Sequence, residues 1–441
     1  AVLTEIFPKL KSKTFSFAKL RGSIARVGND AGFDRLINSY SYGGLFRNDM
    51  AWFQGDAVRK NPNLKPETTI SKEIGAEVRL LDGRLTADVT YYDKYTCDQI
   101  VESELSYLSN YQRVIINSGK ISNKGWEISV SGVPVKVKNF EWKTIFNWSK
   151  NNSMVESLPE GIDKIQIGSG VYNVKSYAEV GKPYGAIYAK TFKRDAEGYI
   201  LCQLDGSPKE GQDYEYLGCV QADWRGGWNN VFRLGNFSFS VMFDFQKGGK
   251  FFSQTSIQSS VDGQSVKSLE GRDADFFSRK ILGESDEERY GFMRPQNANT
   301  PTANGQIYPD WGRPKGVVLP NCRYDEDVEG LAGQQVLGYC TPERYWMHYT
   351  SRDISRFIYD ASYVKLREIT VSYDLPKKWL RKTPFQTFRV AAVGRNIATL
   401  FANTPHGLDP QATSTTGNAQ GFERGFNLPS ATYGFDIKVS F

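Results

Sequence analysis

The feature that most constrains the fold is a strict alternation of apolar and polar residues, repeated in many short segments. In residues 237–245 the odd positions are Phe, Phe, Val, Phe and Phe, and the positions between them are Ser, Ser, Met and Asp. Residues 70–80, 126–130, 140–148 and 433–441 alternate in the same way. Because successive side chains of a β-strand point to opposite faces of its sheet, this pattern predicts strands with one apolar face.

The alternation predicts an all-β, antiparallel architecture of about ten strands. They lie near residues 14–27, 69–81, 84–100, 113–133, 138–150, 225–234, 236–247, 358–375, 385–400 and 429–441.

Short and long connections alternate between these strands. The short connections are 81–84, 134–138 and 234–236. The long connections are 28–68, 151–224, 247–357 and 401–428, and a further hairpin is expected near 184–192. Because antiparallel strands reverse direction at each connection, every short turn falls at one end of the sheet and every long loop at the other. This arrangement is typical of an outer-membrane β-barrel.

Further features agree with strands that cross a membrane. No run approaches about 18 consecutive apolar residues, so no transmembrane helix is predicted, but a spanning strand needs only about 9–11 residues with alternate ones apolar. The apolar faces are rich in aromatic residues at the strand ends, as in interfacial girdles. Loops this long are rare in compact soluble domains. We therefore predict an antiparallel transmembrane β-barrel with long extracellular loops.

Alternation alone also fits a second class of protein. A secreted or surface carbohydrate-binding β-protein has strands of the same pattern, but its apolar faces meet each other and not lipid. A small closed barrel is a further alternative, although the loops are too large for one. An open sheet would leave unpaired edges in lipid. We therefore expect this sheet to need further strands of the same polypeptide.

The composition excludes several functions. The net charge is +6, but Lys and Arg are scattered, so no nucleic-acid binding is predicted. With two histidines, neither a Ser-His-Asp triad nor a metal site is expected. We predict that the protein is not an enzyme and binds no cofactor. An acidic group does not match a calcium loop and is expected to be solvated. Its members are Asp325, Glu326, Asp327 and Glu329.

Five cysteines occur without any C-x-x-C pair. An oxidising compartment would allow disulfides. Cys202 and Cys219 are near neighbours in one loop, and Cys322 and Cys340 in another. These four allow three connectivities, of which local pairing is our hypothesis. Cys97 is expected to be a buried, small apolar residue.

Several motifs resemble those of TonB-dependent transporters. Residues 61–67, N-P-N-L-K-P-E, and 73–77, E-I-G-A-E, resemble the N-x-N-L-K-P-E…E-x-G-x-E segment of that group. Asn117 and Gly119, followed by N-K-G-W-E at 123–127, resemble its N-x-G…N-x-G-x-E strand.

Other motifs are more specific. D-A-S-Y-V-K-L-R-E at 360–368 resembles a strand of the SusC/RagA family of the Bacteroidetes. G-R-N at 394–396 and G-L-D-P at 407–410 resemble its next strand and loop, and residues 428–441 resemble its closing strand. The resemblance extends from about Leu20 to Phe441.

The resemblance implies a barrel of about 22 strands in the outer membrane, plugged by an amino-terminal domain. Residues 1–441 would be the carboxy-terminal part of the barrel domain, since neither a plug nor a TonB box is found in them. It also implies import of oligosaccharides or oligopeptides with a SusD-like surface lipoprotein, powered by the TonB complex. Outer-membrane lipid and the rest of the barrel and plug would be further partners. A siderophore receptor is the alternative within the wider group, against which the SusC-like strand argues.

Aromatic residues in or beside the long loops are the candidate substrate contacts. Aromatic faces stack on sugar rings and peptide side chains, although such residues also pack loops or contact a lid. The candidates are Trp224, Tyr308, Trp311, Tyr345 and Trp346.

Charged and terminal residues have separate interpretations. Lys365, Arg367 and Glu368 are expected to form inward-facing ion pairs in a polar lumen. Phe441 is expected to anchor the last strand at the membrane interface, and the resemblance implies that it also serves as an assembly signal.

Overall fold

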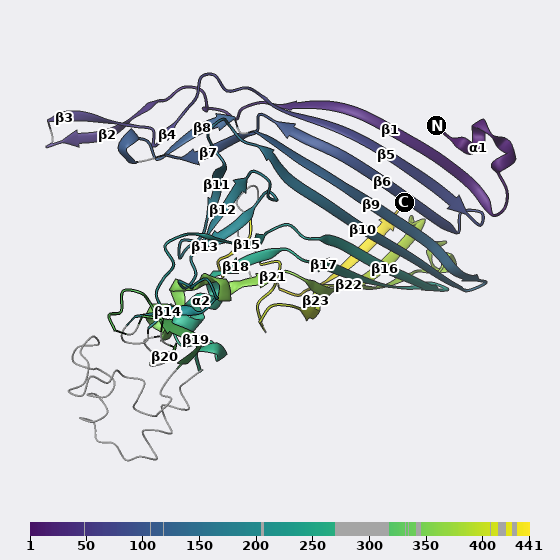
Figure 1. Cartoon of the computed structure of the whole chain (residues 1–441). Coiled ribbons are helices and arrows are strands. Elements are labelled where there is room, and N and C mark those ends of the chain that lie inside the picture. Colours follow the sequence, from purple (N-terminus) through teal and green to yellow (C-terminus); the bar gives the residue numbers. More distant parts are fainter. Residues whose placement is uncertain are drawn as a thin grey trace, which may run out of the picture.

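The computed structural model describes most of the chain, and its largest unit is a ten-stranded sheet. The described residues are 1–47, 49–105, 107–117, 119–203, 207–269, 317–330, 332–333, 335–340, 345–405, 407–412, 420–425 and 430–441. The sheet has the order β1-β5-β6-β9-β10-β16-β17-β22-β23-β25, and neighbouring strands are antiparallel throughout. Figure 1 shows it as a curved trough with β1 at one edge.

The strands of this sheet agree closely with the predicted ones. They are β1 (Phe15–Asn29), β5 (Glu67–Leu80), β6 (Leu85–Cys97), β9 (Lys120–Val137), β10 (Phe140–Ser157), β16 (Trp224–Leu234), β17 (Phe237–Lys247), β22 (Tyr363–Asp374), β23 (Thr387–Ala402) and β25 (Thr432–Ser440). Two predicted strands are each divided. The predicted strand 113–133 becomes β8 (Arg113–Asn117) and β9, and the predicted strand 358–375 becomes β21 (Ile358–Asp360) and β22.

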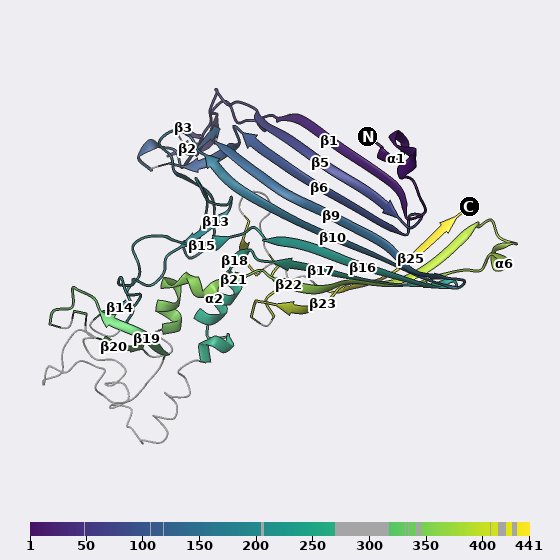
Figure 2. The same cartoon turned by 45° about the vertical axis from the view of Figure 1, so that its right-hand side comes forward.

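The alternation gives the sheet two chemically different faces. In-register neighbours bring aromatic residues together on one face: Trp228 lies between Phe146 and Phe243. We call this the outward face. Trp228 is 43% exposed and Phe435 is 86% exposed, so no described part of the chain covers them. The opposite, inward face carries polar residues such as Asp88, and the trough curves around it (Figure 2).

The buried apolar cluster lies in the loops and not against the sheet. It includes Ile187 of one long loop and Phe252, Ile257 and Trp346 of another. A sandwich would instead bury the outward face against a second sheet. Within the described ranges this arrangement is not found, and the apolar face is free to contact lipid.

The short and long connections fall at opposite ends of the sheet, as predicted. The short turns include residues 81–84, where Leu81, Asp82 and Gly83 all have positive φ. The connection from β22 to β23 holds α6 (Lys377–Leu380), and α1 (Leu3–Ile6) and η1 (Pro8–Leu10) precede β1 at the same end. None of the described helices has the length and hydrophobicity to cross a bilayer.

The long loops carry small sheets and helices at the other end of the trough (Figure 1). Between β1 and β9 lie β2 (Tyr40–Phe46), β3 (Met50–Gly55), β4 (Val58–Arg59), β7 (Ile100–Glu104), η2 (Tyr107–Ser109) and β8. Between β10 and β16 lie β11 (Lys164–Ser169), β12 (Lys175–Glu179), β13 (Ala186–Ala189), β14 (Ile200–Cys202) and β15 (Glu215–Cys219). The hairpin expected near 184–192 corresponds to β13, which pairs with β12 and β15.

The longest loop precedes β22 and contributes much of the buried cluster. Its described elements are β18 (Lys250–Ser253), α2 (Gln254–Val261), η3 (Val266–Leu269), β19 (Val317–Tyr324), β20 (Gln335–Cys340), η5 (Tyr345–Tyr349), η6 (Thr350–Arg352), η7 (Ile354–Phe357) and β21. β18 pairs with β21 and with β24 (Phe422–Glu423) of the last loop, so loops far apart in sequence form one assembly.

Candidate functional site

The inward face contains a polar hollow of about 520 Å³, which we call the wall hollow. The Arg21 guanidinium donates two hydrogen bonds to the Asp88 carboxylate, at 2.6 and 2.5 Å, and a third to Thr90. A bidentate pair of this kind holds both side chains in a fixed geometry. Asn147, Arg225 and Asp244 also line the wall hollow. The inward face therefore offers fixed charges and hydrogen-bonding groups to a solute.

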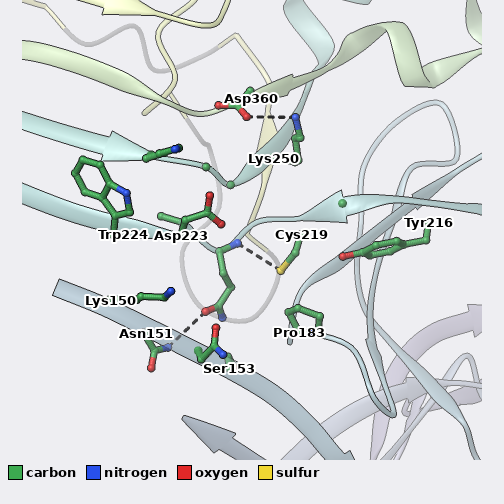
Figure 3. Close-up of a pocket in the computed structure, with 17 residues that line it drawn as sticks. Lys150, Asn151, Ser153, Pro183, Tyr216, Cys219, Asp223, Trp224, Lys250 and Asp360 are labelled. Atoms are coloured by element: carbon green, nitrogen blue, oxygen red, sulfur yellow. Dashed lines mark hydrogen bonds and ion pairs between the residues drawn. The ribbon is translucent and has the colours of Figure 1, made fainter. Parts of the chain in front are cut away.

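A second hollow, of about 570 Å³, lies at the extracellular ends of β10, β16 and β17 (Figure 3). We call it the mouth hollow. Trp224, Tyr216, Gln221, Lys250 and Asp360 line it. These residues combine two aromatic rings with an amide and an ion pair. This is the residue combination that holds polar organic ligands.

Hydrogen bonds fix the floor of the mouth hollow. Asn151 of β10 donates to Asn123 at 3.0 Å and to Gln221 at 3.5 Å, and it accepts from the Tyr92 hydroxyl at 3.0 Å. Asn123 belongs to the N-K-G-W-E motif. One side-chain amide thus ties three strands to the loop that covers them.

An ion pair forms another wall of the mouth hollow. Lys250 Nζ lies 3.3 Å from Asp360 Oδ2. Burial alone would raise the pKa of Asp360, but hydrogen bonds from Ser362 and Asn403 and the charge of Lys250 lower it overall. Asp360 therefore stays ionised at neutral pH.

A third hollow, of about 370 Å³, borders the other two. It shares Arg225 and Asp244 with the wall hollow and Lys250 with the mouth hollow. Tyr363 and Gln411 complete its lining. The three hollows are therefore neighbours, which follow one another from the inward face to the extracellular loops.

A charged network supports these hollows where β22 meets the last loop. Lys365 Nζ lies 2.5 Å from Asp409 Oδ1 and 3.0 Å from Gln411 Oε1, and its side chain is 1% exposed. Arg367 pairs with Asp244 and donates to Gln411 at 2.6 Å. The predicted inward-facing ion pairs are therefore present, and they join the D-A-S-Y-V-K-L-R-E strand to the G-L-D-P loop.

Glu368 takes part in a separate pair. Arg395 Nε of β23 lies 2.9 Å from its carboxylate. The arginine side chain is 68% exposed. This pair is consequently a weaker restraint than the Lys365–Asp409 pair.

The N-P-N-L-K-P-E segment is held by the motif that follows it. The Asn117 side chain accepts a hydrogen bond from Lys65 N at 2.9 Å and donates to Lys65 O at 2.8 Å and Asp98 O at 2.7 Å. Glu67 accepts from Ile100 N at 2.8 Å. These hydrogen bonds cross-link the two loops at the point where the chain enters the sheet.

The predicted substrate contacts lie in different parts of the structure. Trp224 lines the mouth hollow and packs edge to face on Phe245, with ring centroids 5.9 Å apart. Trp346 is 2% exposed within the buried cluster, so it packs the loop core and does not face a hollow. Tyr345 begins η5, but its side chain lies outside the described residues, as do Tyr308 and Trp311 entirely.

The strand register opposes one of the two local disulfides, Cys322–Cys340, and the Cys202–Cys219 disulfide stays a prediction. Cys202 is buried in the loop cluster, and Cys219 lies beside the mouth hollow. Cys322 pairs in register with Val336, whereas Cys340 pairs with Val317. Four residues of strand separate Val336 from Cys340, about 13 Å, and a disulfide needs Cα atoms within about 7 Å. Cys97 is partly buried.

The acidic group at 325–329 is solvated only in part, because Glu326, Asp327 and Glu329 are exposed but Asp325 is buried. Asp325 is 3% exposed and lies 2.8 Å from both Lys193 Nζ and Lys209 Nζ. Burial by itself would raise its pKa, but the two lysines outweigh burial and lower the pKa to about 2. The Asp325 carboxylate joins the end of β19 to the loop before β16 through its ion pairs with both lysines. Its lysine partners lie more than 100 residues away in the sequence, so no local sequence pattern predicts these ion pairs.

Phe441 is 75% exposed at the end of the sheet that carries the short turns. Its ring packs against Phe385, with centroids 5.3 Å apart. This position agrees with an interfacial anchor.

Comparisons with known proteins agree with this architecture. Residues 13–187 match the family described as "TonB dependent receptor-like, beta-barrel". TonB-dependent receptor P3 of Formosa agariphila is 25% identical over 395 residues, which cover 85% of this chain and 33% of the relative. TonB-dependent receptor SusC of Bacteroides thetaiotaomicron is 29% identical over 104 residues, 23% of this chain and 10% of SusC.

A solved structure supports the same fold. The RagAB peptide transporter superposes with a TM-score of 0.66 at 17% identity and covers 100% of this chain and 42% of its own. The chain spans about a third of the length of receptor P3, at 33%.

Proposed function

We propose that this chain, which belongs to the TonB-dependent receptor β-barrels of the outer membrane, forms the wall and extracellular mouth of an importer. Its cargo is an oligosaccharide or an oligopeptide. The observation that carries the proposal is the row of three neighbouring hollows lined by charged and polar side chains, which we call the cargo path, on a sheet whose outward face is apolar. A solute on this path would meet polar groups while lipid meets only the other face.

The chemistry of the path suits a polar, extended cargo. Arg225 and Asp244 present both signs of charge along the wall, and Gln221 offers amide donors and acceptors at the mouth. Trp224 and Tyr216 provide aromatic faces for sugar rings or side chains. We propose that Trp224, which begins its strand at the rim of the sheet and lines the mouth hollow, contacts cargo there.

The proposed importer works with further parts. A SusD-like lipoprotein would cover the extracellular loops, and TonB would act through a plug domain outside these residues. The RagAB structures are of a peptide transporter, and the relatives are TonB-dependent receptors by name. This supports, for our chain, a cargo of similar size and a similar energy source.

The test uses the full-length receptor in its own cells. Deleting its gene should abolish growth on one panel, either oligosaccharides as carbon source or oligopeptides as nitrogen source, and loss of TonB should have the same effect. Trp224→Ala should raise the cargo concentration needed for half-maximal uptake about 5–30-fold, the loss expected of about 1–2 kcal/mol of stacking. Trp379→Ala is the matched control, since Trp379 is 61% exposed on α6 at the opposite end. Uptake of both panels without TonB, or an equal effect of the two tryptophan variants, would refute the proposal.

A further inference from the structure

The outward face carries a band of cations at its extracellular end. Lys150 of β10 pairs in register with Trp126 of β9, and Lys247 of β17 pairs with Trp224 of β16. All of the cations in this band are exposed. We call it the outer cation band, and its members are Arg26, Lys72, Lys124, Lys150 and Lys247.

The register shows that these cations face outward. Lys124 lies opposite Asp93, two residues from the Trp126–Tyr91 pair on the same face. Lys72 also lies opposite Asp93, on the other side of it. Because residues two apart on a strand share a face, Lys72 and Lys124 point to the same side as the aromatic girdle.

The band is confined to one end of the face. At the short-turn end of the same strands, the outward-facing residues that the structure describes are apolar or aromatic. They are Ala18, Leu20, Val78, Leu80, Val135, Val137, Phe140, Trp142, Phe237 and Phe239.

The band has few counter-charges within the protein. Lys124 Nζ lies 3.7 Å from Asp93 Oδ2, with side chains 52% and 37% exposed. No ion pair joins Arg26, Lys72, Lys150 or Lys247 to a carboxylate among the described residues. The positive charge is therefore available to an external anion.

The position of the outer cation band on the outward face indicates which part of the membrane lies beside it. Below the cations it is the apolar surface that contacts lipid chains, so the next layer outward is the headgroup layer of the extracellular leaflet. Long cationic side chains reach from an apolar surface to such a layer. We infer that the outer cation band binds the phosphate groups of anionic lipids in the outer leaflet. Arg26, Lys72 and Lys124 line none of the three hollows of the cargo path, whereas Lys150 and Lys247 also border the mouth hollow.

The test measures lipid that copurifies with the full-length receptor. The variant carries Arg26→Gln, Lys72→Gln and Lys124→Gln, while Lys150 and Lys247 are kept because they also line the mouth hollow. Lipid A bound per receptor, measured by mass spectrometry after mild detergent extraction, should fall at least about fivefold, the factor expected for one cation near an anionic surface. Adding lipid A to the delipidated wild type should raise its thermal midpoint, and dephosphorylated lipid A should not.

A matched control separates the band from net charge. Lys94→Gln, Lys136→Gln and Lys143→Gln remove the same charge from inward-facing positions of β6, β9 and β10, and this variant should keep its lipid. Unchanged lipid in the outward variant, an equal loss in the inward variant, or equal stabilisation by dephosphorylated lipid A would each overturn the inference. None of these outcomes depends on which cargo is imported.

Discussion

The ammonium group of Lys365 lies 2.5 Å from Oδ1 of Asp409, which ties strand β22 to the loop that follows β23. The lysine side chain is 1% exposed and that of Asp409 is 14% exposed. Water therefore cannot replace the carboxylate if it is removed. The strand that lines the path and the loop that closes over it depend on one buried ion pair.

Replacing Asp409 by Asn should destabilise the loop assembly around β22 by about 3–5 kcal/mol, because Lys365 would stay buried without a counter-charge. The measurement is the temperature at which the folded, fast-migrating form of the receptor disappears on electrophoresis. Combining Asp409→Leu with Lys365→Met should recover much of the loss, since no charge is then buried.

Glu368→Gln is the control for this prediction. It removes the partner of Arg395, which is 68% exposed, and should cost about 1 kcal/mol or less. Equal effects of Asp409→Asn and Glu368→Gln would show that burial does not set the strength of these pairs.

Gly125 should tolerate no side chain. A Cβ atom there would lie 2.3 Å from the Lys150 carbonyl oxygen and 2.4 Å from the Tyr92 hydroxyl. The Lys150 carbonyl oxygen is a backbone atom, and it cannot move without breaking hydrogen bonds between β9 and β10. Gly125→Ala should therefore lower the stability of the fold by about 1–3 kcal/mol or more. Gly434→Ala in β25 is the control, because no atom lies within 4 Å of its added Cβ. Both variants should be scored by the folded fraction in the outer membrane, and a normal yield of Gly125→Ala would contradict the prediction.

The Asp325 network should make the loop assembly sensitive to acid. The pKa of Asp325 is lowered to about 2 from an ordinary value of 3.8, so protonation favours the opened loop. Its contribution, about 2 kcal/mol, is present above about pH 4 and is lost as the pH falls towards 2. Hydrogen exchange of the Asp325 amide, which donates to Cys202 O at 3.1 Å, measures the free energy of local opening.

Asp325→Asn should therefore lower that free energy at neutral pH and remove its dependence on pH below 4. Asp327→Asn is the matched control, because Asp327 pairs with the same Lys209 but its side chain is 70% exposed. Its effect should be small. An unchanged acid dependence in Asp325→Asn would assign the titration to another group.

The strands were predictable because a two-residue period is a local property of the sequence. The prediction fails at 113–133, where one strand is predicted but the structure has two, β8 and β9, with a break between them. The Asn117 side chain accepts a hydrogen bond from the Lys65 backbone. At Gly119 an added Cβ would lie 1.8 Å from the Ser157 carbonyl oxygen. Both contacts are long-range, so alternation could not reveal them.

The site was less predictable for the same reason. Trp224 could be proposed because it stands where a strand meets a long loop. Tyr216 and Gln221 lie in a connection without any period, and their place beside Asn151 follows only from the folded loop. Trp346 was proposed on residue type alone, which does not distinguish an exposed ring from one that is 2% exposed.

Cys219 offers a chemical probe of the mouth hollow. Burial raises the pKa of its thiol, so at pH 8 a smaller fraction is thiolate than in an ordinary cysteine. Alkylation of Cys219 should consequently be slower than that of a free thiol and should accelerate as the pH rises above 8. Peptide mass spectrometry resolves it from the other cysteines, and Cys202, which is 0% exposed, should react only on unfolding. Bound cargo should slow the reaction of Cys219 further, because the residue lines the mouth hollow. A Cys219 that is inert at every pH until a reductant is added would instead reveal a disulfide, and one that cargo does not protect would place the cargo elsewhere.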